Sequence, residues 1–428
     1  MHEKINFIQM SNNKKIIPDL RFPEFVNEGE WEEKEVGEIF EITRGYVLAM
    51  SLIKEKQSNE YLYPVFSSQT KNNGLAGFYK EYLYDNAITW TTDGANAGDV
   101  NFRSGKFYCT NVCGVLLNKK GFANNCIAEL INSVSKKYVS YVGNPKLMNG
   151  VMSKIKIPIP SLKEQQKIAS CFSSLDEVIA VHSQKLELLK DHKKGLMQKL
   201  FPQKGEKVPK LRFPGFVKEG EWVEKTFGQV YDFKLTNSFP REYLNYEKGN
   251  VKNIHYGDIH TKFNTLFDIT KEIVPYINEE VPIDKIKKES YCIAADIVFV
   301  DASEDLNDIG KSIEIVNLNN EKLVPGLHTL LARQREKNIT IGFGGYLFKS
   351  EWVRKQIQRE AQGAKVLGIS ATRISNVKIS YPKNSKEQKK VAECLASLDE
   401  LIIAQTKKIE QLKLHKKGLM QGLFPKNS

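Results

Sequence analysis

Apolar residues within 164–202 recur at alternating spacings of four and three positions, with mostly Glu, Gln, Lys, Ser and Asp between them. This spacing predicts one long helix with a single narrow apolar seam. A second stretch, 387–425, carries the same pattern. At 1.5 Å a residue each helix would be about 58 Å long, and so narrow a seam needs a partner helix, so we expect the two to pair with each other as a coiled coil. The seam positions are Ile168, Phe172, Leu175, Ile179, Leu186, Leu189, Leu196 and Leu200, and Val391, Leu395, Leu398, Ile402, Ile409, Leu412, Leu419 and Leu423.

The two stretches are copies of each other, because roughly 24 of their 39 positions are identical without a gap. A second repeated block opens each half: Leu20-Arg21-Phe22-Pro23 recurs as Leu211-Arg212-Phe213-Pro214, and Trp31 recurs as Trp222. The chain is therefore predicted to consist of two similar halves with an internal pseudo-twofold repeat. Both seams are interrupted at matching places, His182 with Gln405 and Lys193 with Lys416.

Between the repeats, short apolar runs alternate with Gly, Asn, Thr and Ser, a texture typical of strands and turns with a few helices. We expect an α+β protein: two α/β domains of similar architecture, separated by the two long helices. The predicted boundaries are 1–160 (variable core 38–157), 161–202 for the first long helix, 203–382 (variable core 229–380), and 383–428 for the second. Expected strands are 61–66, 78–84, 87–91, 106–109, 112–117, 155–159, 251–254, 293–300, 311–316 and 328–333; expected helices are 127–142 and 346–362; 91–100 is expected to be a polar loop, and Ser161 a helix N-cap.

Composition narrows the class of partner. The apolar content of 41% is enough for real cores and excludes a disordered protein. The net charge of +12 favours a polyanionic partner, with nucleic acid first and an anionic membrane second. No apolar run approaches 18 residues, the beginning of the chain lacks a signal-peptide layout, and none of the six cysteines forms a C-x-x-C pair. We therefore expect reduced cysteines and a cytoplasmic protein that is not inserted in a membrane.

Motifs for catalysis are near misses. Pro18-Asp19 with Glu32-Glu33-Lys34 imitates the carboxylate layout of metal-dependent nucleases, but the second copy lacks both key carboxylates, and we expect loop and turn rather than paired strands there. Gly310-Lys311-Ser312 resembles the end of a phosphate-binding loop, but Asp305 stands where that loop needs its first glycine. The chain is therefore predicted to be a binder without catalytic residues or metal ligands.

Taken together, the repeated motifs resemble those of the specificity subunit of type I restriction–modification enzymes, over almost the whole chain. The resemblance rests on the doubled Leu-Arg-Phe-Pro and Glu-x-Trp block and on Ile157-Pro158-Ile159-Pro160 leading to Glu164-Gln165. It also rests on a Leu-Asp-Glu triplet and a Lys-Lys-Gly-Leu-Met-Gln segment in both long helices.

The resemblance implies a non-catalytic subunit with two target-recognition domains, each reading one half of a bipartite, asymmetric site in double-stranded DNA. It implies that the two long helices pair as an antiparallel coiled coil, which sets the spacing between the half-sites and docks two methyltransferase subunits, and that motor–nuclease subunits join for cleavage. S-adenosylmethionine, ATP and Mg are then expected on the partner subunits, with no cofactor on this chain. The methyltransferase-docking candidates are Leu175, Asp176, Glu177, Lys194, Met197, Leu398, Asp399, Glu400, Lys417 and Met420.

Reading bases requires polar side chains on loops that can enter a groove, whereas phosphate contacts position a domain without specifying sequence. The candidates for base reading in the first domain are Ser67, Ser68, Gln69, Lys71, Asn72, Thr91, Thr92 and Asn96, and those for phosphate contacts are Arg103, Lys106, Lys146 and Lys154. The candidates in the second domain are His255, Tyr256, Lys262, Asn264, Ser303, Lys311 and Lys365.

Two other functions stay open at this point. A self-sufficient nuclease or methyltransferase would need the motifs that are missing. A coiled-coil DNA-binding scaffold without a nuclease partner, in a methylation-only or orphan system, would keep the helices; without any DNA readout it would have similar intervening domains and bind DNA without regard to sequence. The dissimilar cores favour separate reading tasks instead.

Overall fold

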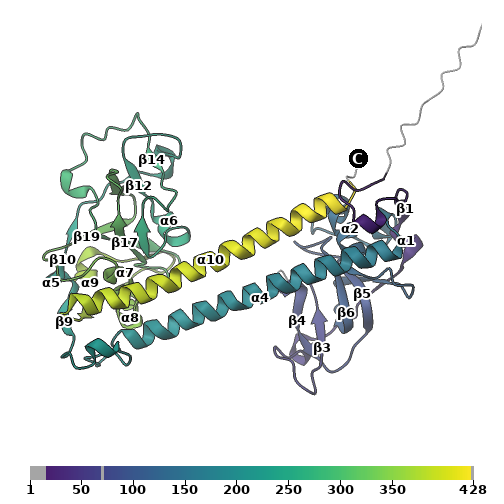
Figure 1. Cartoon of the computed structure of the whole chain (residues 1–428), viewed down its shortest axis with the longest axis horizontal. Coiled ribbons are helices and arrows are strands. Elements are labelled where there is room, and N and C mark those ends of the chain that lie inside the picture. The colour runs from purple at the N-terminus through teal and green to yellow at the C-terminus, as the bar shows by residue number, and fades with distance from the viewer. Residues whose placement is uncertain (1–15, 69–71, 426–428) are drawn as a thin grey trace, which may run out of the picture. The chain divides into compact units, whose positions relative to one another are not determined.

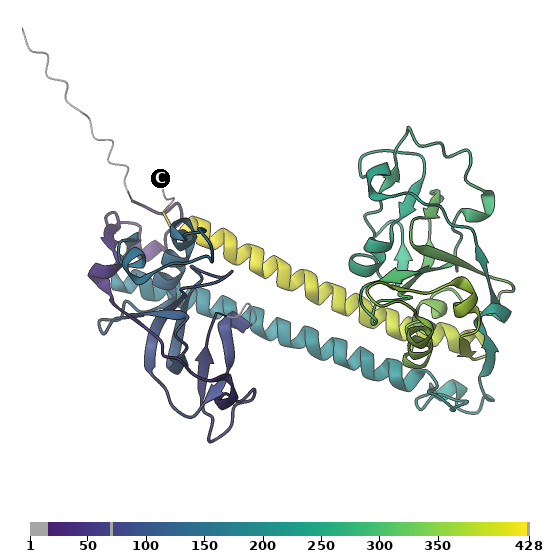
Figure 2. The ribbon, with the colours of Figure 1, turned by 180° about the vertical axis from the view of Figure 1, so that it is seen from behind.

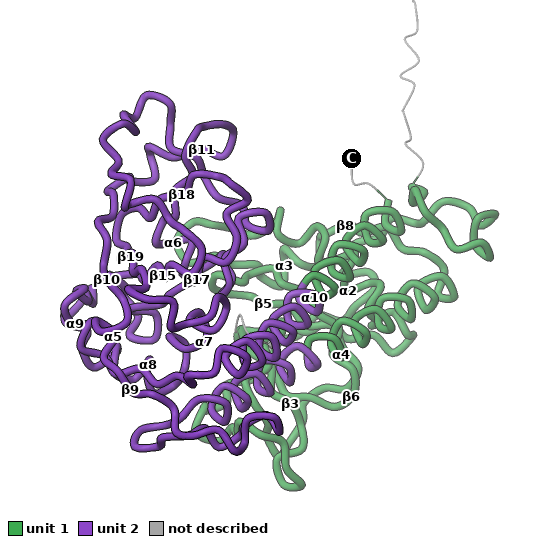
Figure 3. Tube along the Cα trace, turned by 60° about the vertical axis from the view of Figure 1, so that its left-hand side comes forward, with its two compact units in different colours: residues 1–183, 407–428 green, residues 184–406 purple. Residues whose placement is uncertain are grey.

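The computed structural model describes residues 16–68 and 72–425 (Figure 1). The chain divides into two units, 1–183 with 407–428, and 184–406 (Figure 3). Two 39-residue helices, α4 (Leu162–Leu200) and α10 (Ser385–Leu423), each contribute to both units. Each unit is thus built from one variable domain, the first half of one long helix and the second half of the other.

Unit 1 contains a six-stranded sheet in the order β2-β7-β5-β6-β3-β4, with α2 packed against β6. A separate two-stranded ribbon, β1 with β8, joins the beginning of the domain to its end. The elements before α4 are η1 (Pro23–Phe25), β1 (Glu32–Glu35), α1 (Val36–Ile39), β2 (Glu41–Arg44), η2 (Met50–Leu52), β3 (Tyr63–Phe66), η3 (Asn72–Gly74), β4 (Leu75–Tyr79), β5 (Tyr84–Thr91), β6 (Val100–Cys109), β7 (Cys113–Leu117), α2 (Asn125–Ser135), η4 (Lys136–Tyr138), α3 (Asn149–Met152) and β8 (Lys156–Ile159).

Unit 2 repeats this plan with a five-stranded sheet, β10-β19-β15-β17-β13, a four-stranded sheet, β11-β14-β12-β18, and the ribbon of β9 with β21. Its elements are η5 (Pro214–Phe216), β9 (Val223–Thr226), α5 (Phe227–Val230), β10 (Tyr231–Lys234), η6 (Arg241–Tyr243), β11 (Leu244–Asn245), β12 (Lys252–Ile254), α6 (Tyr256–Thr261), β13 (Leu266–Asp268), β14 (Tyr276–Ile277), η7 (Lys288–Ser290), β15 (Ile297–Val300), β16 (Ala302–Ser303), β17 (Ser312–Asn317), β18 (Leu323–Pro325), β19 (Thr329–Gln334), α7 (Phe343–Leu347), α8 (Glu351–Glu360), β20 (Leu367–Gly368), α9 (Ala371–Ser375) and β21 (Lys378–Tyr381).

A buried glutamate at the start of each long helix explains the repeated opening block. Glu164 is 1% exposed and accepts hydrogen bonds from Arg21 Nε (2.8 Å), Arg21 Nη2 (2.7 Å) and Trp31 Nε1 (3.2 Å). Glu387 in unit 2 is held in the same way by Arg212 and Trp222. A buried carboxylate is tolerated only with such a full set of donors. The repeated arginine and tryptophan therefore fasten the domain entrance to the helix.

The two long helices lie side by side in each unit and run in opposite directions (Figure 1, Figure 2). In unit 1, Phe172 of α4 meets Phe424, just after α10, at 5.8 Å between ring centroids, and both lie in the domain core. In unit 2 the roles are exchanged: Phe201, just after α4, joins Trp222 in a core that contains Leu395 of α10. The end of each long helix therefore completes the core of the domain that the other helix starts from.

The two lysines that interrupt the seams form ion pairs, one in each unit. Lys416 Nζ lies 2.9 Å from Asp176 and 3.3 Å from Glu129 in unit 1, and Lys193 pairs with Asp399 in unit 2. Lys416 and Asp176 are the repeat counterparts of Lys193 and Asp399. Because polar groups inside a seam must find partners, these pairs fix the register of the helices.

The prediction of the two long helices is confirmed to within two residues at each end, and Ser161 caps α4, with its Oγ 3.3 Å from Glu164 N. The predicted helix at 127–142 was too long: α2 ends at Ser135, η4 continues only to Tyr138, and the chain then extends because Ser140 and Lys146 form a bridge. The predicted helix at 346–362 is two helices, α7 and α8, because Ser350 has an extended backbone between them.

A strand prediction and a loop prediction were also wrong. The run 78–84 is the end of β4 and the start of β5 with a turn between them, since β4 pairs with β3 but β5 pairs with β6 and β7. The stretch Glu32–Glu35, expected to be a loop, is strand β1, which pairs antiparallel with β8. The carboxylates on β1 are exposed and pair with lysines, Glu32 with Lys34 and Glu33 with Lys156.

Replacing Arg21 with alanine should destabilise unit 1 strongly, because it removes the bidentate partner of a buried carboxylate. We expect the free energy of unfolding of that unit to fall by about 3–5 kcal/mol, measured by urea denaturation followed through tryptophan fluorescence. Lys167→Ala is the matched control: the Lys167–Glu24 pair is about half exposed and should cost less than about 1 kcal/mol. Equal losses in the two variants would contradict a role for the buried site.

Candidate functional site

Loops from five parts of unit 1 are hydrogen-bonded into one group, here called loop cluster 1: residues 44–47, 66–68 with 72–74, 91–99, 109–113 and 139–147. Its centre is Thr92, directly after β5. Thr92 N donates to Val112 O (3.0 Å), and Thr92 O accepts from Leu147 N (2.9 Å). Arg44 Nη2 donates to the Thr92 hydroxyl (3.0 Å), and Asn96 Nδ2 donates to Ser68 O (3.1 Å). These hydrogen bonds thus join loops that are distant in sequence into one surface.

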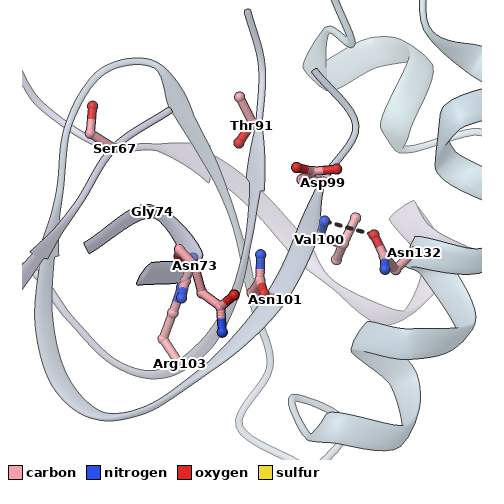
Figure 4. Close-up of a pocket in the computed structure, with 9 residues that line it drawn as sticks. All are labelled: Ser67, Asn73, Gly74, Thr91, Asp99, Val100, Asn101, Arg103 and Asn132. Carbon is pink, nitrogen blue, oxygen red and sulfur yellow. Dashed lines mark hydrogen bonds between the residues drawn. The ribbon is translucent and has the colours of Figure 1, made fainter. Parts of the chain in front are cut away.

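A polar cavity of about 140 Å³ opens beside this cluster (Figure 4). Three sequence-predicted residues, Ser67, Thr91 and Arg103, line it, so the structure brings them together. The remaining lining side chains are amides, a carboxylate and an aliphatic residue at Asn73, Asp99, Val100, Asn101 and Asn132. Gly74 completes the wall with φ +85°, where an added Cβ would lie 2.7 Å from Ser67 O, so only glycine fits.

Arg103 is the only cationic side chain that lines the described part of this cavity. It is 9% exposed, donates from Nε to Thr89 Oγ1 (3.0 Å) and from Nη2 to Asn73 O (2.8 Å), and stacks 3.8 Å from the Phe66 ring centroid. Burial lowers the pKa of Arg103 to about 10, and none of the described carboxylates forms an ion pair with it. A buried guanidinium without a counter-charge favours an anionic or electron-rich ligand.

The other candidates of the first domain lie in different surroundings. Ser67, Ser68 and Asn96 are half-buried within loop cluster 1, and Lys146 is exposed there. Thr92 has no exposed surface, so it holds the loops together and does not present its side chain. Lys106 lies over the Tyr82 ring, and Lys154 follows α3; neither belongs to the cluster. Gln69 and Lys71 lie outside the described residues, and Asn72 begins η3.

Unit 2 carries the corresponding group, loop cluster 2: residues 234–238, 301–311, 325–328 and 362–369. Asp301, directly after β15, takes the place of Thr92: its N–H donates to His328 O (3.1 Å), and its carbonyl accepts from Ile369 N (2.8 Å). Asn237 N donates to Pro325 O (3.3 Å). The same backbone connections thus hold both clusters, although their side chains differ.

Four candidates of the second domain lie on or beside loop cluster 2. Ser303 and Lys311 belong to it, and Lys365 is exposed in its 362–369 segment. The Tyr256 ring lies 5.3 Å from that of His328, so Tyr256 borders the cluster.

The remaining candidates are occupied by local contacts. His255 caps α6 by accepting from Gly257 N (3.1 Å), and burial lowers its pKa, so it is neutral at pH 7. Lys262 lies 3.0 Å from Asp258, and Asn264 Nδ2 donates to Glu272 (2.8 Å).

Sequence reasoning missed the amides of the cavity, Asn73, Asn101 and Asn132, because they come from three separate elements and share no motif. In unit 2 it missed Arg241, which forms two 3.0 Å hydrogen bonds to the buried Asp258 and meets the side chain of His255. A basic residue in a Ser-Phe-Pro-Arg turn was a weak signal that could have drawn attention.

The docking candidates on the long helices differ in how exposed their side chains are. Asp176 and Asp399 are taken up by the seam ion pairs, and Leu398 is buried. Leu175, Met197 and Met420 are half-buried. The exposed members are Glu177, Glu400, Lys194 and Lys417, which repeat between the helices. These four leave charged side chains available to another molecule.

Among the described residues, no group of three or more His, Cys, Asp or Glu side chains is arranged to hold a metal ion. No described helix is long and apolar enough to cross a membrane.

The family model for the type I restriction modification DNA specificity domain matches the chain twice, at residues 28–191 and 219–414. The specificity subunit of the MjaVIII type I restriction enzyme of Methanocaldococcus jannaschii is 27% identical over 96% of this chain and 95% of its own length. The N-terminal part of a putative type I specificity subunit of Mycoplasma pneumoniae is 40% identical over 32% of this chain and 72% of its own length.

The fold also matches a solved structure. The crystal structure of the S subunit of a type I restriction–modification system from M. genitalium aligns with a TM-score of 0.62 over 96% of this chain and all of the other, at 15% identity. At that identity the match concerns the fold.

Inorganic phosphate should stabilise unit 1 through Arg103. At millimolar phosphate, with chloride at equal ionic strength as reference, we expect the thermal midpoint of wild-type unit 1 to rise and that of Arg103→Met to stay unchanged, since ligand binding to the folded state stabilises it. Arg354→Met is the control, because Arg354 is also desolvated but donates to the carbonyls of Asn307, Ile309 and Gly310. An equal rise in wild type and Arg103→Met would exclude the cavity as an anion site.

Proposed function

Because the chain belongs to the family of type I restriction–modification specificity subunits, we propose that each of its two domains reads one half of a bipartite, asymmetric DNA site. The observation that carries this proposal is the pair of loop clusters. Identical backbone connections at Thr92 and Asp301 hold loops whose side chains differ. A shared scaffold with different polar side chains suits two reading tasks at two dissimilar half-sites.

The proposed reading residues are those that the loops present to solvent or to the cavity. In the first domain these are Ser67, Ser68, Thr91 and Asn96, with Arg103 and Lys146 for the phosphates. In the second they are Tyr256, Ser303, Lys311 and Lys365. Gln69, Lys71 and Asn72 stay candidates from the sequence, as do Lys106 and Lys154 for phosphates, and Lys262 and Asn264. Thr92 and His255 are assigned to holding the loops.

We assign the spacing of the half-sites and the docking of two methyltransferase subunits to α4 and α10. The support is that exposed charges repeat along both helices, Glu177 with Glu400 and Lys194 with Lys417, while the domain cores diverge. A partner present in two copies requires two similar surfaces. Motor–nuclease subunits would join this complex for cleavage.

In this proposal the chain has no catalytic role. S-adenosylmethionine, ATP and Mg belong to the partner subunits, and the complex works on DNA in the cytoplasm. The domain limits stay as expected from the sequence: recognition domains at 1–160 and 203–382, and spacer helices at 161–202 and 383–428.

The function is tested by a base-resolution methylome of a host that carries the methyltransferase subunit, with and without this chain. We expect a new methylated motif of two short half-sites around a fixed gap. Exchanging residues 38–157 for the corresponding core of another specificity subunit should change one half-site and leave the gap and the other half-site intact. Absence of any motif, although the methyltransferase co-purifies, would support an orphan scaffold instead.

The docking surface is tested by charge reversal. Glu177→Lys with Glu400→Lys should reduce co-purification of the methyltransferase about tenfold or more, because like charges across an interface cost several kcal/mol. Asp191→Lys with Glu393→Lys is the matched control, since these exposed helix acids do not repeat between the copies. Changing Asp176 or Asp399 would instead break the seam ion pairs. Retained co-purification in the Glu177 and Glu400 variant would remove these residues from the docking surface.

A further inference from the structure

The segment that follows α2 in unit 1 is unusually basic. Residues 136–156 contain five lysines and no aspartate or glutamate. Exposed apolar side chains alternate with these lysines at Tyr138, Tyr141, Val142, Met148 and Val151. A lysine-rich surface interleaved with exposed apolar side chains fits a polyanion that also offers apolar faces, and stacked bases inside a phosphate backbone have both properties.

Two sets of backbone hydrogen bonds hold the tip of this segment in a defined shape. Ser140 and Lys146 form two backbone hydrogen bonds with each other, each 2.9 Å long, and these bonds close a five-residue tip. Gly94 N donates to Pro145 O (3.0 Å), which fixes the tip to the loop after β5. Val139 and Leu147, on either side, are buried. The tip is therefore preorganised and belongs to loop cluster 1.

The tip presents its apolar side chains outward. Tyr141 is 68% exposed. Val142 is 91% exposed, which is the highest value for a large apolar side chain among the described residues. The next residue, Gly143, has φ +74° and allows the tight turn that leaves both side chains pointing into solvent.

We propose that Tyr141 and Val142 form a wedge that inserts at a base step of duplex DNA in the half-site read by the first domain. Inserted apolar side chains partly unstack a base step and bend the duplex, and flanking cations compensate the phosphates. Lys137 and Lys146 are exposed on either side of the tip and would contact these phosphates. The proposal rests on the proposed DNA-reading function and adds to it a distortion of the DNA as a second source of specificity.

The second domain has no such wedge. Its corresponding segment, 362–369, is joined to loop cluster 2 by the Ile369 N to Asp301 O bond, which matches Leu147 N to Thr92 O. The residues at its tip are Gly363, Ala364, Lys365 and Val366. Gln362 and Gly368 exchange backbone hydrogen bonds as Ser140 and Lys146 do, so Gly363 and Ala364 stand where the first domain has Tyr141 and Val142, and the DNA distortion should be confined to one half-site.

The test uses the full chain bound to its methyltransferase subunits and a duplex that contains the methylated motif. 2-Aminopurine is placed in turn at each adenine of both half-sites, and its fluorescence reports unstacking. Wild type should increase the fluorescence at one step in the first domain's half-site. Tyr141→Ser with Val142→Ser should abolish that increase and weaken binding about tenfold, the order expected for losing one stacked contact, without changing the salt dependence. Ile273→Ser is the control, since Ile273 is 77% exposed and lies outside both loop clusters and both long helices.

Several results would overturn the wedge. Specific binding by wild type with no fluorescence increase at any step would do so while leaving the proposed function intact. A fluorescence increase that persists in the double variant would also overturn it. If the double variant keeps the DNA distortion but no longer binds the methyltransferase, the tip contacts that protein and not DNA. If the methylome yields no motif, the DNA-reading function itself fails, and the wedge falls with it.

Discussion

A carboxylate buried at the start of each long helix is the constraint on which both units depend. Glu164 and Glu387 are each 1% exposed, so their charges are stable only inside the fork of Arg21 or Arg212 and against the indole of Trp31 or Trp222. Each of these sites joins the entrance of a domain to the helix that leaves it. The residues that fasten the entrance to the exit lie outside the sheets, which leaves the sheets freer to differ.

That freedom is visible in the two loop clusters. Thr92 and Asp301 occupy the same place after a central strand and make the same pair of backbone hydrogen bonds, although one is a hydroxyl and the other a carboxylate. Backbone hydrogen bonds hold the loops in the same arrangement in both units, and the side chains on those loops differ. One cluster adjoins a cavity lined by the buried Arg103 guanidinium, while the other borders Tyr256, whose ring contacts those of His255, His260 and His328. The two surfaces thus have different chemistry on one scaffold.

The sequence predicted the features that arise from periodicity and repetition, such as α4, α10, the Ser161 cap and the polar loop after β5. It did not predict features that depend on contacts between distant positions. The early end of α2 follows from a bridge between Ser140 and Lys146, and no local signal marks it. Lys193 and Lys416 were visible as interruptions of the seams, but their partners Asp399 and Asp176 required the register of the helices. Asn73, Asn101 and Asn132 meet only after the sheet has formed.

The exchange of helix ends has a consequence for shorter chains. The core of unit 1 is completed by Leu423 and Phe424, and the first half of the chain already contains their copies, Leu200 and Phe201. A protein made of that half alone would contain both an incomplete domain core and a copy of the helix end that completes such a core. Two such copies could complete each other by reciprocal swapping, and because both would then read with the same loops, the resulting homodimer would be suited to a palindrome. Duplication followed by divergence of one core would convert that symmetric reader into an asymmetric one.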